Sequence, residues 1–132
     1  MVLTGWNDRL SVGHSEIDSD HSKLADLLDQ LEDAVANHLG QEAYDKVLNE
    51  LIAVTRAHFA NEEQLMAVHS YPLAEQHTAE HVSLLRELEA FKAKFDSYTI
   101  TLSKAQLKLL DDWLTQHIVE ADKALAASLP PG

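Results

Sequence analysis

The chain has 132 residues, of which ten are basic and 22 are acidic, so its formal net charge is −12 with neutral histidines. Such a charge repels nucleic acid phosphates and anionic membrane surfaces, and we expect neither as a partner. The absence of cysteine excludes disulfides, thiolate metal sites and cysteine nucleophiles. Any bound metal must therefore be held by nitrogen and oxygen atoms.

Length and composition favour one all-α domain spanning residues 1–132. Only four glycines and three prolines are present, which is few for a turn-rich β fold. The amino-terminal segment MVLTGWNDRLSV has no apolar signal-peptide core, and no stretch approaches the ~18 apolar residues that a membrane span requires. Because the chain also lacks cysteine, we expect a cytoplasmic protein.

Apolar residues that recur at alternating steps of three and four predict four helices after a short arm over residues 1–16. Gly40 suits the end of the first helix, and Pro72 suits the first turn of the third. Ser103 with Gln106 forms a capping box for the fourth. The expected helices span about residues 18–38, 41–67, 72–95 and 103–127. Long helices with short connections predict an up-down-up-down antiparallel four-helix bundle.

Six polar side chains interrupt the apolar stripes at positions that should face the bundle core. They are His21, His58, Glu62, His77, His81 and His117. A single core histidine is most often structural, but a polar group buried without a partner costs roughly 2 to 7 kcal/mol. At ~1.5 Å per residue, all six fall within roughly 5 to 15 Å of the same end of the bundle. One shared site is therefore predicted.

The spacing of these residues is typical of a metal site. Four residues separate His58 from Glu62, which places both side chains on one helix face. The same step separates His77 from His81. Imidazole and carboxylate ligands without sulfur suit iron, zinc, manganese or copper. Because five histidines are too many for one ion with an open position, we favour two metals bridged by carboxylates.

The acid that accompanies His117 is ambiguous in the segment HIVEAD, residues 117–122. A step of three keeps Glu120 near the face of His117, whereas a step of five turns Asp122 roughly 140° away. Spacing alone therefore favours Glu120. No metal-binding role is expected for the remaining histidines, which are His14, His38 and His69.

The ordered motifs resemble those of the hemerythrin family, and of its bacterial branch in particular. The matching segments are Trp6, VGHSEIDSDH ending at His21, HFANEE from His58, Tyr71–Pro72, HTAEH from His77 and WLTQHIVEAD from Trp113. They occur in family order and spacing across roughly residues 6 to 125. The resemblance implies an all-α, hemerythrin-like four-helix bundle around a non-heme diiron centre.

The match to the family motifs implies which residues of this chain are the metal ligands. The implied ligands are His77, His81 and His117 for one iron, and His21 and His58 for the other. The implied bridges are Glu62, Asp122 and an oxo or hydroxo group, so the resemblance selects Asp122 over Glu120. A π-type bulge in the last turns could bring Asp122 to the metals, because it brings positions five apart nearer to each other.

The implied ligand set leaves one open position, on the iron held by His21 and His58, where we expect dioxygen to bind. The resemblance therefore implies reversible dioxygen binding by an oxygen carrier, store or delivery protein, and not an enzyme. An apolar wall beside the ligands would exclude water, although ordinary core packing is the alternative role for its candidates. These candidates are Leu24, Phe59, Trp113, Leu114 and Ile118. Ala25 stands where the family often has an aromatic residue, and the smaller side chain could open a path to the metals or leave space that a neighbour fills.

Other functions fit parts of the pattern. HTAEH also matches the H-x-x-E-H signature of zinc metalloproteases, with Glu80 as general base, but that assignment leaves three core histidines without a role. A ferritin-like diiron oxidase typically uses Glu-x-x-His pairs and more carboxylates. The further alternatives are an oxygen or redox sensor module and a structural bundle with satisfied core histidines.

Overall fold

The computed structural model describes residues 14–97, 102–117 and 121–129, except for the side chains of Leu114 and Thr115. These residues form four long helices and one short helix, and no strand is present among them. The helices are α1 (Ser15–Ala36), α2 (Gln41–Val68), α3 (Ala74–Asp96), α4 (Lys104–His117) and α5 (Lys123–Ser128). The predicted all-α class is confirmed.

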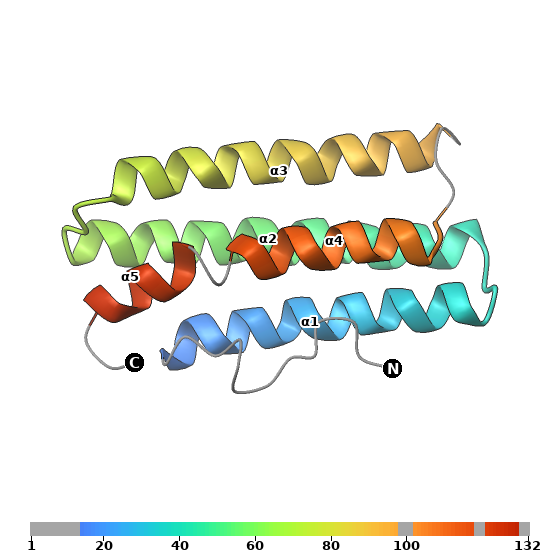
Figure 1. Ribbon diagram of the computed structural model, residues 1–132, viewed down its shortest axis with the longest axis horizontal. Coiled ribbons are helices and arrows are strands. Elements are labelled where there is room, and N and C mark those ends of the chain that lie inside the picture. The colour runs from blue at the N-terminus through green and yellow to red at the C-terminus, as the bar shows by residue number, and fades with distance from the viewer. Residues whose placement is uncertain (1–13, 98–101, 118–120, 130–132) are drawn as a thin grey trace.

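Successive long helices run in opposite directions, so the starts of α1 and α3 lie at the same end of the molecule as the ends of α2 and α4 (Figure 1). Helix α1 packs against α2 and α4, and α2 packs against α3. The predicted up-down-up-down bundle is therefore confirmed. No helix in the described part of the chain combines the length and apolar character needed to cross a membrane.

The first connection is built differently from the prediction. Helix α1 begins at Ser15 and ends at Ala36, two to three residues before the expected bounds. His38 adopts a left-handed conformation with φ of 51°, and the Leu39 N–H donates to the Ala34 carbonyl at 3.0 Å. Such a left-handed residue closes a helix. Gly40, with φ of 99°, therefore leads into α2 and does not itself end α1.

The fourth predicted helix is described in two parts. The Gln106 N–H donates to Ser103 Oγ at 3.4 Å, so the predicted amino-terminal cap is present. Helix α4 nevertheless ends at His117, and α5 begins at Lys123. Residues 118–120 lie outside the described residues, so one continuous helix over residues 103–127 stays a prediction. Pro72 lies in the turn before α3, which begins at Ala74.

Two apolar clusters fill the bundle at different heights. The larger contains Leu24, Leu27, Leu28, Leu31, Leu48, Leu51, Leu88, Phe95, Leu102, Leu107 and Leu110. The smaller contains Ile17, Met66, Tyr71, Leu125, Ala126 and Leu129. Along the chain, the polar core residues predicted from the stripes fall between residues of the two clusters. Apolar side chains therefore close the polar layer from both sides.

The contrast between Leu107 and Leu109 on α4 tests this assignment of the core. Leu107 exposes 1% of its surface and Leu109 exposes 59%. We expect Leu107→Ala to lower the free energy of unfolding by about 2 to 5 kcal/mol, because the substitution leaves a cavity. Leu109→Ala in the same helix should change it by no more than about 0.5 kcal/mol. Denaturant unfolding measures both, and equal losses would contradict the assignment.

Candidate metal centre

Seven buried polar side chains meet in the layer between the apolar clusters. They are His21 of α1, His58 and Glu62 of α2, His77 and His81 of α3, His117 of α4 and Asp122, which precedes α5. None of them exposes more than 5% of its surface. The structure thus brings together all six polar residues from the predicted stripes and adds the acid that the family resemblance selected.

These side chains form two overlapping groups of potential metal ligands. One group contains Glu62, His77, His81, His117 and Asp122, and the other contains His21, His58, Glu62 and Asp122. Within each group, one ligand atom from every residue lies within 4.8 Å of all the others. The two carboxylates belong to both groups, whereas each histidine belongs to one.

Asp122 is shared through its two carboxylate oxygens. Its Oδ2 lies 2.6 Å from His21 Nε2 and 3.3 Å from His58 Nε2. Its Oδ1 lies 3.1 Å from His77 Nε2 and 2.9 Å from His117 Nε2. One oxygen therefore faces each histidine group, which is the arrangement of a bridging carboxylate.

Glu62 is shared in the same way. Its Oε2 lies 3.3 Å from His58 Nε2. Its Oε1 lies 3.1 Å from His77 Nε2 and 2.9 Å from His81 Nε2. The two carboxylates thus span the same pair of groups, one from α2 and one from the residue that precedes α5, and the geometry suits two cations side by side.

Unsatisfied polar atoms in this layer test whether a metal fits. Glu62 Oε2, His117 Nε2 and Asp122 Oδ1 are buried, and none of them makes a hydrogen bond to a described residue. Each lies about 3 Å from another ligand atom, but the approach lacks hydrogen-bond geometry. Buried polar atoms without partners are costly, and cations bound among them would satisfy all three. The donor set of imidazole and carboxylate suits iron and other first-row metals.

Charges in the layer oppose the effect of burial. Burial lowers the pKa of His58, but its hydrogen bond to Asp122 and the charges of Glu62 and Asp122 raise this pKa to about 9. Burial also lowers the pKa of His77, but its contacts with Asp122 and Glu62 and the charges of these two residues raise this pKa to about 9. Burial raises the pKa of Asp122, yet the close imidazoles of His117, His21, His58 and His77 hold it well below its ordinary value. Without metal, protons on the histidines therefore balance the two carboxylates near neutral pH.

A local change of helix geometry brings Asp122 into the layer. Ala121 and Asp122 have π-helical backbone, as the bulge hypothesis expected. An uninterrupted stripe would turn Ala121 inward, but Asp122 is fully buried and Ala121 is only half-buried. The inward position has thus moved by one residue. Glu120, which spacing alone favoured, lies outside the described residues.

Three carboxylates beside the layer were missed as contributors to it by reasoning from the sequence. Asp20, Glu63 and Glu80 each approach the Nδ1 atom of one of the clustered histidines. Their only sequence signal is that each directly precedes or follows a residue of the layer. A pattern of inward-facing residues does not identify such neighbours, because adjacent residues on a helix point in different directions. For Glu80, the sequence suggests only the role of a protease base in HTAEH. In the structure it lies 2.9 Å from His117 Nδ1.

Two of the predicted pocket residues, Phe59 and Leu24, are buried. Phe59 stacks on the His81 ring, with ring centroids 3.9 Å apart and an angle of 6° between the planes. Its ring also meets His117 edge-on at 5.6 Å. Phe59 therefore forms a wall of the three-histidine group. Leu24 is fully buried in the larger apolar cluster, and Ala25 beside it is also buried.

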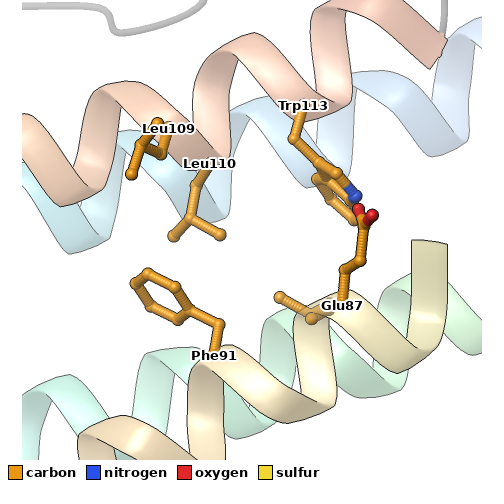
Figure 2. A pocket seen from close by; sticks show the side chains of 6 residues that line it. Glu87, Phe91, Leu109, Leu110 and Trp113 are labelled. Atoms are coloured by element: carbon orange, nitrogen blue, oxygen red, sulfur yellow. The ribbon is translucent and has the colours of Figure 1, made fainter. Parts of the chain in front are cut away.

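Trp113 lies half-buried at one end of a groove between α3 and α4 (Figure 2). The groove encloses about 240 Å³, and Glu87 and Phe91 rise from α3 toward Leu110 and Trp113 of α4. Trp113 also lines a neighbouring depression that reaches His117. It therefore separates a largely apolar surface groove from the polar layer. The predicted pocket role of Leu114 and Ile118 concerns side chains outside the described part of the structure.

The other histidines stay outside both ligand groups. His14 is buried at the start of α1, while His38 and His69 are exposed at the ends of α1 and α2. That none of them has a metal-binding role stays a prediction. The zinc protease alternative is not supported, because the two histidines of HTAEH share their carboxylates with histidines from the other three long helices.

Comparisons with known proteins agree with this site. The chain matches the family model of the hemerythrin HHE cation binding domain over residues 12–129. A bacteriohemerythrin of Stenotrophomonas maltophilia is 29% identical over 126 residues, which cover 96% of this chain and 81% of the relative. A myohemerythrin of Riftia pachyptila is 26% identical over 117 residues, which cover 89% of this chain and 86% of the relative.

Solved structures share the fold. A wild-type hemerythrin crystal structure has 26% sequence identity and a TM-score of 0.85, and the match covers 94% of this chain and 95% of that chain. A hemerythrin with a leucine-to-alanine substitution has 25% identity and a TM-score of 0.88, with 98% of both chains covered. Because the family model spans nearly the whole chain and the ligand cluster stands in its core, this chain belongs to the hemerythrin family.

Proposed function

We propose that the protein binds two non-heme irons and uses them to bind dioxygen reversibly, as an oxygen carrier, store or delivery protein. The observation that carries this proposal is the orientation of Glu62 and Asp122. Each carboxylate directs one oxygen to each histidine group, as two bridged cations require. Bacteriohemerythrins and a myohemerythrin among the relatives support iron as the metal.

The two groups are unequal, and this inequality supports dioxygen as the ligand. Three histidines belong to one group, whereas only His21 and His58 belong to the other. With both carboxylates shared, the cation beside His21 and His58 has fewer protein ligands and keeps a position for an external molecule. Bound ferrous iron would supply the electrons that dioxygen accepts reversibly at that position.

The chain's own residues contribute ligand orientation and dryness. Apolar clusters lie on both sides of the polar layer, and Phe59 covers part of the three-histidine group. A site closed in this way slows the entry of water, which would favour irreversible oxidation over release of dioxygen. The protein then acts as a binding protein rather than as an enzyme.

Oxygen cycling tests the central proposal. Anaerobic addition of Fe(II) should load two irons per chain, one for each ligand group. Exposure to air should then produce a visible charge-transfer band that disappears on deoxygenation and returns when oxygen is readmitted. Iron analysis and absorption spectroscopy over several cycles check both expectations. Irreversible oxidation in the first cycle would favour an oxidase or redox role, and a failure to take up iron would refute the metal centre.

The choice between the two acids of HIVEAD is tested by bound iron. Asp122→Ala should remove most of the iron, because this side chain faces both histidine groups. Glu120→Ala, the matched control in the same segment, should retain it. Iron content per chain after identical anaerobic loading is the measurement. A greater loss in Glu120→Ala would reverse the assignment.

The raised histidine pKa values predict how the metal-free protein responds to pH. His58 and His77 have pKa values of about 9, against an ordinary value of 6.5. Their contribution to stability is therefore complete below about pH 6.5 and is lost as the pH rises through about 9.

Thermal unfolding of the metal-free protein should accordingly show a Tm that falls between about pH 7 and about pH 9.5. The metal-loaded protein is the control and should show a smaller fall, because a bound metal replaces the protons. A metal-free Tm that stays constant or rises over this range would contradict the charge balance described for the layer.

A further inference from the structure

Three of the clustered imidazoles have a carboxylate at the nitrogen that faces away from the centre of the layer. Glu63 Oε2 lies 3.0 Å from His81 Nδ1, and Glu80 Oε1 lies 2.9 Å from His117 Nδ1. In the third contact, Asp20 Oδ2 lies 3.1 Å from His58 Nδ1. In each of these rings the Nε2 atom faces the shared carboxylates.

The three contacts follow one rule of chain order. Each acid is located on one helix and contacts a histidine of the next: α1 to α2, α2 to α3 and α3 to α4. Each acid also directly precedes or follows a residue of the polar layer, as Asp20 precedes His21. Two adjacent residues of one helix therefore have different partners. One lies in the polar layer, and the other contacts a histidine of the next helix.

The chemistry of imidazole gives these contacts a function. When Nε2 binds a metal, the neutral ring carries its proton on Nδ1, and this N–H donates to the carboxylate. A hydrogen bond of this kind fixes the tautomer and the plane of the ring and makes Nε2 a stronger donor to the metal. The orientation of the histidines in the layer thus depends on residues that do not touch the metal.

The acids differ in their surroundings. The Asp20 side chain is 18% exposed and also accepts a hydrogen bond from Asn61 Nδ2 at 3.2 Å. The Glu63 and Glu80 side chains are 40% and 42% exposed. The contact to His58 is therefore held from two sides, whereas the contacts to His81 and His117 lie at the edge of the solvent.

We propose that Asp20, Glu63 and Glu80 are positioning residues that control the two metals separately. Glu63 and Glu80 act through His81 and His117, so they hold the metal of the three-histidine group. Asp20 acts through His58 and holds the metal at which the external ligand binds. This proposal rests on the proposed two-metal centre and adds to it a division of labour among acids outside the ligand set.

The test uses Co(II), a metal for which imidazole and carboxylate are suitable ligands and whose visible absorption reports its coordination. Protein loaded with two equivalents is mixed with excess chelator, and the loss of absorption is followed in time. Glu63→Ala and Glu80→Ala should each release one equivalent about 10-fold faster than the wild type, the lower end of the effect expected for such outer partners. Asp20→Ala should accelerate the other equivalent by a similar factor.

Double variants identify which equivalent each acid controls. Glu63→Ala combined with Glu80→Ala should still leave one slow equivalent, because both acids serve the same metal. Asp20→Ala combined with Glu80→Ala should leave none. Glu50→Ala, at an exposed position of α2, is the matched control and should release both equivalents at the wild-type rate.

Glu80→Gln separates positioning from a loss of folding. The amide oxygen still accepts a hydrogen bond from His117 Nδ1, so this variant should restore the Co(II) spectrum and slow the release relative to Glu80→Ala. Thermal unfolding of the metal-free variants provides a second measurement, and Glu80→Ala should release metal faster even where its Tm matches that of Glu50→Ala.

The outcomes separate this proposal from the metal centre itself. Alanine variants that release Co(II) at the rate of Glu50→Ala would overturn the positioning role and leave the centre intact. The same conclusion follows if Glu63→Ala with Glu80→Ala accelerates both equivalents equally. Wild-type protein that binds neither Co(II) nor Fe(II) would overturn both proposals.

Discussion

The sharing of two buried carboxylates among five imidazoles is the interaction on which the rest of the molecule depends. Isolated polar groups in a core of this size would oppose folding, since each costs several kcal/mol without a partner. Here every one of these groups lies close to another from a different helix, so that Glu62 and Asp122 contact histidines of all four long helices. The helices must therefore keep one relative height, and the antiparallel order of the bundle provides it.

The apolar clusters determine what the polar layer does. A layer open to water would exchange its ligands with solvent, whereas this one is bounded by leucine-rich packing on one side and by a smaller cluster around Ile17 and Leu125 on the other. The same helical periodicity thus places both the apolar side chains that exclude water and the polar side chains of the layer. The acids at the outer nitrogens complete the arrangement, because they connect the buried rings to the partly exposed surface.

Much of this architecture could be predicted from periodicity alone. The stripes located all five histidines and Glu62, because a step of three or four records which residues face inward. Periodicity could not select Asp122, because a regular helix would turn Ala121 inward in its place. The end of α1 was misplaced because His38 adopts a left-handed conformation that glycine would ordinarily provide. The roles of Asp20, Glu63 and Glu80 depend on ring orientation, and no pattern of single residues encodes that.

The π-helical turn at Ala121 and Asp122 has a consequence for how such a bundle can be altered or redesigned. Where a regular helix would turn Ala121 inward, this turn buries Asp122 instead. Regular α-helical geometry at these two residues would turn Asp122 away from the two groups of potential metal ligands. Local regularity and metal binding are therefore competing demands on the same few peptide units, and an idealised four-helix scaffold would have to keep this irregularity to keep the site.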